Sequence, residues 1–166
     1  RRSASGHQAL SATVCTHPFP ADNPWVRATQ VAICVIIEAN STADAPQGPS
    51  SQSVAFSHYN HISAQLPLEP ATGAVVAGGV AHQATQCLAN IKAIVESVDH
   101  ALEDVVKVNI ALTSIQDIDA VDEVYTRFFP GGVPARRIIG VSALPGDALV
   151  QIDAVVGNAE GTPPVG

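Results

Sequence analysis

The sequence has few charged side chains, and few of those are basic. Asp, Glu, Lys and Arg make up 14% of the 166 residues, well below the roughly one quarter that is usual in soluble domains. Only eight residues are Lys or Arg, they are scattered along the chain, and the formal net charge is −7. Because nucleic-acid binding requires clustered cations that neutralise phosphates, direct nucleic-acid binding is disfavoured. A surface poor in charge also indicates that part of it is covered, most simply by another subunit.

Cysteines and long apolar runs are scarce as well. The three cysteines are far apart in the sequence, which predicts no disulfide framework and favours reduced thiols in an intracellular compartment. His58 and His61 have no Cys or carboxylate at ligand spacing, so no metal site is expected. No dinucleotide or phosphate-loop motif occurs, and no cofactor is expected. No stretch approaches the roughly 18 apolar residues of a membrane span, so no membrane partner is expected.

The first 21 residues contain no Asp or Glu and carry Arg1 and Arg2. This composition is typical of the neighbourhood of a mitochondrial transit peptide, and the alternative is an ordinary polar tail. The expected location is therefore the mitochondrion, or otherwise the cytoplasm.

Apolar periodicity predicts an α+β domain with two helices on one face of a mixed or antiparallel sheet. The opposite sheet face would then be bare in a monomer, which makes it a candidate oligomer interface. Residues 1–30 are expected to be an irregular N-terminal extension, 31–156 the domain and 157–166 a C-terminal tail. Tyr59, Asn60 and His61 are expected to form a tight turn. Strands are predicted over 31–38, 54–58, 62–66, 105–112, 136–141 and 149–156, and helices over 80–98 and 115–129.

Several stretches, in order from about Ala43 to Val156, resemble signatures of one family. They are ISAQLP at 62–67, EPATG at 69–73, QATQCLANIKAI at 83–94, LEDVVK at 102–107, 121–129 with its VY and FF pairs, PAR at 134–136, and ALP at 143–145 leading to VQIDA at 150–154. Together they are similar to the RidA (YjgF) family of enamine/imine deaminases, also called L-PSP endoribonuclease-like proteins.

The resemblance implies a chorismate-mutase-like fold and a homotrimer whose sheets form a central β-barrel, with a ligand cleft at each subunit interface. It also implies hydrolysis of 2-imino acids to 2-keto acids and ammonia. Arg136 matches the arginine that binds the substrate carboxylate, although it could instead pair with an acid across a subunit interface. Ser63 matches a serine beside the cleft, or is simply a small strand residue.

Other positions depart from the family pattern. Gln151 stands where the family has the glutamate that orients or deprotonates the attacking water, and glutamine cannot accept that proton. Ala64 replaces a glycine, Ser50 stands where an aromatic is frequent, and Asp122 stands where Asn is frequent. An acid at Asp122 could neutralise Arg136 and repel a carboxylate ligand. Asp153 shares a strand face with Gln151, but its short side chain is not expected to substitute for the glutamate.

Three functions remain open from the sequence. We favour a non-catalytic structural subunit of a larger, mitochondrial assembly over a working imine deaminase, and a small carboxylate-binding module is the third hypothesis. Expected partners are further copies of the chain or paralogues in a mixed trimer, and a small 2-imino or 2-keto acid if the site is functional.

Overall fold

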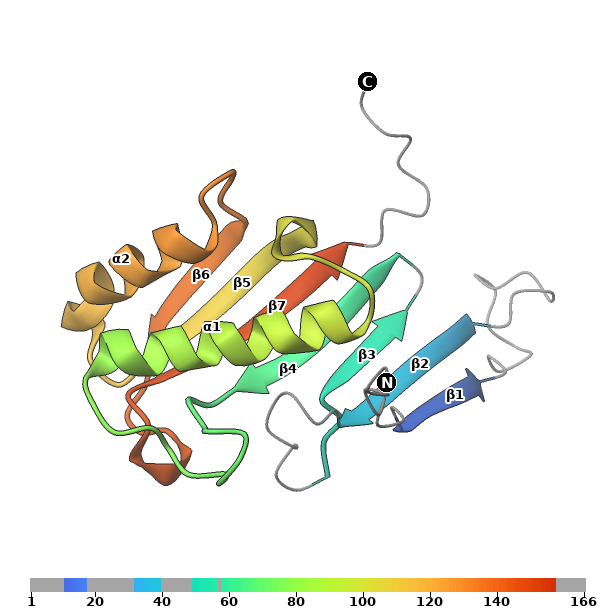
Figure 1. Ribbon diagram of the computed structural model, residues 1–166, viewed down its shortest axis with the longest axis horizontal. Coiled ribbons are helices and arrows are strands. Elements are labelled where there is room, and N and C mark those ends of the chain that lie inside the picture. The colour runs from blue at the N-terminus through green and yellow to red at the C-terminus, as the bar shows by residue number, and fades with distance from the viewer. Residues whose placement is uncertain (1–10, 18–31, 40–48, 57, 158–166) are drawn as a thin grey trace, which may run out of the picture.

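The computed structural model describes residues 11–17, 32–39, 49–56 and 58–157. They form one seven-stranded sheet and two long helices (Figure 1). Three short 3-10 turns lie at Leu102–Asp104, Ile115–Asp117 and Pro145–Asp147. The elements are β1 Ser11–His17, β2 Ala32–Ala39, β3 Ser53–Phe56, β4 Tyr59–Gln65, α1 Val80–Ser97, β5 Val105–Leu112, α2 Ile118–Phe128, β6 Ala135–Gly140 and β7 Val150–Gly157.

The sheet is mixed. Its strand order is β1-β2-β3-β4-β7-β5-β6, and every neighbouring pair is antiparallel except β5 and β6. Those two run parallel because α2 connects them and returns the chain to the same end of the sheet. The last strand, β7, therefore lies in the middle of the sheet between β4 and β5. The predicted α+β class is confirmed.

Both helices pack on the same face of the sheet (Figure 1). Along β7 the side chains of Val150, Ile152, Ala154 and Val156 are buried against them, while the intervening residues are only partly buried. This alternation follows from the pleat, which sends successive side chains to opposite faces. We call the face away from the helices the open face; Gln151, Asp153 and Val155 of β7 lie on it. No helix among the described residues is long and apolar enough to cross a membrane.

The predicted helix over 80–98 is confirmed as α1, and its apolar stripe forms the centre of the core. Two buried polar residues on α1 hold neighbouring loops. The side-chain oxygen of Gln83 accepts the backbone N–H of Leu149 at 2.8 Å, and the Asn90 amide donates to the carbonyl of Leu68 at 3.0 Å. These residues of the motif at 83–94 thus satisfy buried backbone groups that lack a strand partner.

The prediction that residues 1–30 are irregular is wrong over Ser11–His17, which forms β1 and pairs antiparallel with β2. The segment contains the β-branched residues Thr13, Val14 and Thr16, but it lacks apolar alternation, and only the partner strand β2 makes it a strand. The rest of 1–30 lies outside the described residues, as do 158–166 of the expected tail; Gly157 is the last residue of β7.

The predicted turn at Tyr59, Asn60 and His61 is also wrong, because all three belong to β4. Phe56 pairs with Tyr59, so the chain reverses between these two residues. Asn60 is polar yet buried on the helix face next to Ile62. Its side chain interrupts the apolar alternation that would otherwise have marked the strand.

Candidate functional site

Arg136 lies on β6, the edge strand of the sheet, and its side chain is on the helix side. It pairs in register with Val108 of β5, whose side chain is fully buried under the helices. The guanidinium meets the carboxylate of Asp122, on α2, through two hydrogen bonds of 2.6 and 3.4 Å. This fork-to-fork arrangement is the strong form of an arginine–carboxylate pair. Asp122, which was expected to be able to neutralise Arg136, therefore pairs with it within the same chain, and the pairing does not need an acid from across a subunit interface.

Tyr125 of α2 fixes the orientation of Arg136 further. The guanidinium carbon lies 5.0 Å from the centre of the Tyr125 ring, which is the geometry of a cation–π contact. Burial raises the pKa of Tyr125, while the positive charge of Arg136 opposes this shift and the negative charge of Asp122 adds to it. The Tyr125 hydroxyl is buried and has no hydrogen-bond partner among the described residues. Arg136 still keeps 28% of its side-chain surface exposed, so a ligand can reach the N–H donors that Asp122 does not engage.

Gln151 lies on the other face of the sheet from Arg136. It is on the open face of β7, in register with Ala111 of β5, which in turn pairs with Ile139 of β6. Arg136 is on the opposite face of the same sheet. A single copy of the chain therefore does not bring Arg136 and Gln151 to one small ligand.

Ser63 and Ala64 lie in β4, where the pairing with β7 shifts between Ile62 and Gln65. The Ser63 hydroxyl donates to the carbonyl of Ser51 at 2.6 Å, and its backbone N–H donates to the carbonyl of Gln52 at 3.0 Å. Ser63 thus holds the segment that enters β3. Ala64 is exposed and its φ is not positive, so its backbone does not require the glycine that the family pattern has there. Ser50 is exposed and its hydroxyl donates to the carbonyl of Ser51 at 3.4 Å, so Ser50 belongs to the same segment before β3.

Two strand residues that the sequence analysis did not select lie beside Gln151. Arg137 of β6 and Asn109 of β5 line a hollow of about 120 Å³ on the open face. As expected from the alternation of a strand, Arg137 points to the face opposite Arg136. Asp153, which was not expected to reach the cleft, lines the same hollow as Gln151. No local sequence signal marks these residues as neighbours, because their proximity follows from the pairing register of β5, β6 and β7. The lining residues are Asn109, Ile110, Ala111, Arg137, Ile139, Gln151 and Asp153.

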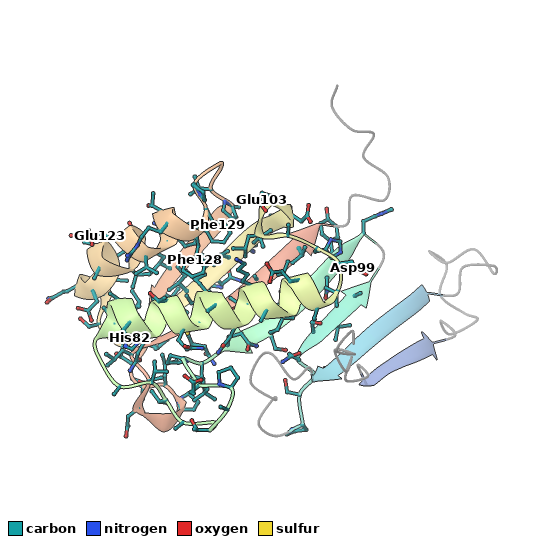
Figure 2. The ribbon with its side chains drawn as sticks, in the orientation of Figure 1. His82, Asp99, Glu103, Glu123, Phe128 and Phe129 are labelled. Atoms are coloured by element: carbon teal, nitrogen blue, oxygen red, sulfur yellow. The ribbon has the colours of Figure 1, made fainter. Side chains whose placement is uncertain are left out.

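A second hollow, of about 180 Å³, lies at the end of α2. Figure 2 shows Phe128 and Phe129 near Glu103, which belongs to the 3-10 turn before β5. The remaining lining residues are Leu102 and 130–132. It contains a single ionisable side chain and no nucleophile, so it offers no arrangement for acid–base or covalent chemistry.

Neither a metal site nor a catalytic thiol is present among the described side chains. No group of three His, Cys, Asp or Glu side chains there could hold a metal ion. Cys87 is buried in the core, and burial raises the pKa of its thiol far above the ordinary value. Because the thiolate is the reactive form, Cys87 is a core residue and not a nucleophile.

Comparison with known proteins identifies a family and named relatives. The profile of the family described as endoribonuclease L-PSP matches residues 41–157. The chain is 41% identical over 117 residues to the 2-iminobutanoate/2-iminopropanoate deaminase of Capra hircus, covering 69% of this chain and 85% of the goat protein. It is 40% identical over 113 residues to a RutC family protein of Pyrococcus horikoshii, covering 68% of this chain and 90% of that protein.

Solved structures share the fold. The YjgF gene product of E. coli aligns with a TM-score of 0.68 and 36% identity, covering 72% of this chain and 96% of the E. coli chain. E. coli TdcF, solved with bound serine, aligns with a TM-score of 0.70 and 31% identity, covering 74% and 98% of the two chains. Strand β1 lies outside the family match, which begins at residue 41.

Proposed function

Because this chain belongs to the endoribonuclease L-PSP (RidA/YjgF) family, we propose that it hydrolyses small 2-imino acids to 2-keto acids and ammonia, at a rate that Gln151 and Asp122 reduce. The observation that carries the proposal is the fixed and accessible guanidinium of Arg136, in a chain 37–41% identical to mammalian 2-iminobutanoate/2-iminopropanoate deaminases. The net charge of −7 gives no physical support to RNA cleavage.

The reaction adds one water to the imine. The water oxygen forms a bond to the imine carbon while the nitrogen takes up a proton. The resulting amino alcohol then expels ammonia and leaves the keto group. The Gln151 amide oxygen can accept a hydrogen bond from the attacking water and orient it, but the water's proton must pass to solvent instead of to the side chain. Orientation without a general base supports a slow reaction.

The complete site requires more than one copy of the chain under this proposal. Arg136 and Gln151 are on opposite faces of one sheet, so a ligand that contacts both must lie between Arg136 of one copy and Gln151 of another. A trimer, either of identical chains or mixed with paralogues, would supply such an interface. In a mixed trimer, a paralogue could also contribute the carboxylate that Gln151 lacks.

The test is the release of pyruvate from 2-iminopropanoate that is generated in situ. We expect slow but measurable turnover, and kcat about 100-fold higher for Gln151→Glu, because a general base contributes roughly 10²–10⁴-fold. Arg136→Ala should reduce kcat/KM by about tenfold or more through loss of a charged hydrogen bond. Arg127→Ala is the matched control, because Arg127 is exposed and its guanidinium donates to the carbonyl of Glu123 on its own helix. Turnover that is unchanged by Arg136→Ala would contradict the proposal.

A second candidate is a non-catalytic structural subunit of a larger assembly in the mitochondrion. The Asp122–Arg136 ion pair favours it, because a permanent internal carboxylate already occupies the fork that would bind substrate. In this case Gln151→Glu would not restore turnover. Size fractionation of a gentle lysate would also place the protein at a mass far above that of a trimer. A free species of about 50 kDa with measurable turnover would reject it.

A further inference from the structure

Two of the three cysteines lie directly opposite each other on neighbouring strands. Cys15 belongs to β1 and Cys34 to β2, and the antiparallel register pairs these two positions. The register runs without a shift from Ala12 to His17, so the pairing does not fall at an irregular point of the ladder. The spacing of the cysteines in the sequence predicts no disulfide framework, but strand register is not visible in that spacing.

The register brings the two backbones to the separation that a disulfide requires. Directly opposed residues of an antiparallel pair have Cα atoms about 4.5–5.5 Å apart and share a face of the sheet. The Cα atoms of a disulfide are usually about 4.4–6.8 Å apart, so this position falls within the allowed range. The third cysteine, Cys87, lies on α1 in the buried core, which leaves Cys15 and Cys34 as the pair.

Strand β1 has a single neighbour in the described sheet. It is the edge strand and pairs with β2 alone. Figure 1 shows β1 and β2 beyond β3, at the end of the sheet away from α2. A two-stranded pairing by itself is only marginally stable in water, so a covalent link between β1 and β2 would have a large effect on whether β1 stays in place. The strand also precedes the family match, which begins at residue 41.

We propose that Cys15 and Cys34 form an intrachain disulfide that fixes β1 to the sheet. The oxidant is a small disulfide of the glutathione type. One cysteine thiolate attacks a sulfur of glutathione disulfide and releases one glutathione. The second cysteine then attacks the mixed disulfide and releases the other. The chain loses two protons and two electrons, and the glutathione disulfide becomes two thiols.

The link joins two strands of one copy and uses no part of the proposed ligand cleft. Exposed apolar side chains that favour association lie in β4, β5 and β6, and β3 separates β2 from the nearest of these strands. Because both cysteines belong to the same chain, the disulfide can form before copies associate. The inference is therefore independent of the proposed function.

The experiment equilibrates the full chain with oxidised and reduced glutathione, blocks the remaining thiols with N-ethylmaleimide, and determines the intact mass and the linked peptides. We expect one disulfide per chain, between Cys15 and Cys34. At a fixed concentration of reduced glutathione, half-oxidation should need about tenfold less oxidised glutathione in native buffer than in urea, because the sheet holds the two backbones together. Cys87→Ser should oxidise like the wild type, because Cys87 takes no part in the link.

A variant with the thiol moved along β1 is the matched control. Thr13 pairs with Ile36, so Thr13→Cys combined with Cys15→Ser places the thiol diagonally to Cys34. Diagonal neighbours are about 7–8 Å apart, which is beyond the usual range for a disulfide. At the glutathione ratio that half-oxidises the wild type, we expect this variant to form roughly a tenth as much intrachain disulfide or less.

Hydrogen exchange supplies a second measurement. Oxidation should slow exchange of the β1 amides about tenfold or more, because opening of the edge strand then has to occur with its partner attached. Cys34→Ser should show no such change under the same oxidant.

Three outcomes would overturn the inference. The first is glutathione adducts on Cys15 and Cys34 without a link between them. The second is a disulfide that joins two copies instead of two strands. The third is equal oxidation of the wild type and the Thr13→Cys, Cys15→Ser variant, which would show that strand register does not select the pair.

Discussion

At the scale of single residues, Arg136 and Arg137 differ in whether a neighbouring carboxylate offsets their charge. Asp122 engages the guanidinium of Arg136 through both carboxylate oxygens, and Tyr125 lies under it. The net charge presented to a ligand at that point is therefore close to neutral. Arg137, one residue further along the strand, faces the other way and keeps its charge. A difference of one residue in a strand thus separates a satisfied arginine from an available one.

Replacing Asp122 with Asn should strengthen carboxylate binding at Arg136. The amide keeps a hydrogen-bond acceptor for the guanidinium but removes the negative charge that offsets it. We expect Kd for 2-oxobutyrate to fall about fivefold to tenfold, in line with the modest energy of a partly exposed ion pair. Calorimetric titration measures this directly. Asp119→Asn, an exposed acid in the first turn of the same helix, is the control, and an Asp122→Asn affinity equal to that of the control would contradict the expectation.

At the scale of elements, α1 covers the sheet and also holds two loops in place. Its apolar stripe fills the core, and Gln83 and Asn90 bind the backbone of loops that precede α1 and β7. The loop that Gln83 holds at Leu149 carries the chain into β7, where Gln151 and Asp153 lie. The position of the open-face hollow therefore depends on polar contacts made on the other side of the sheet.

Removal of the Asn90 side chain should destabilise the fold. Asn90→Ala leaves the buried carbonyl of Leu68 without its donor, and a buried unsatisfied group costs about 1–3 kcal/mol. We expect the free energy of unfolding to fall by about 2 kcal/mol in urea denaturation. Thr85→Ala on the exposed side of α1 serves as the control. A loss no larger than that of the control would show that the loop does not depend on Asn90.

At the scale of the whole molecule, the open face carries large apolar side chains that the described residues leave uncovered. Large apolar side chains remain exposed at Tyr59 of β4, Val106 of β5 and Ile139 of β6, at 50%, 46% and 39%. A sheet face that keeps such side chains in water favours association. The proposed reaction requires an association in which Arg136 of one copy lies near Gln151 of another.

Placing a charge on this face should prevent assembly. Val155→Asp puts a carboxylate on the open face of β7, and we expect the native mass to fall from that of the proposed trimer, about 50 kDa, to that of the 17.1 kDa chain. Size-exclusion chromatography with light scattering measures the change. Ala89→Asp, on the exposed side of α1, should leave the mass unaltered. A Val155→Asp protein that keeps the wild-type mass would place the interface elsewhere.

The sequence by itself determined the local structure and the family. Apolar periods marked α1, α2 and the strands of the core, because burial of one face imposes a period of 3.6 or 2 on the side chains. The short motifs between Ala43 and Val156, taken in order, were enough to indicate the family to which the chain belongs. Gln151 and Asp122 could be recognised as departures because each lies at a fixed place within such a motif.

Only the tertiary structure determined which residues of different strands are neighbours. The strand order β4-β7-β5-β6 joins segments that are far apart in the sequence: Tyr59 of β4 pairs with Gly157 of β7, and Asn109 of β5 donates a hydrogen bond to Asp153 of β7. Pairing register across such distances carries no local signal, so the Arg137 hollow could not be found from motifs. For the same reason β1 was missed, since a strand without apolar alternation is defined by its partner. The side of the sheet on which each arginine lies, and hence its charge partner, follows from that register.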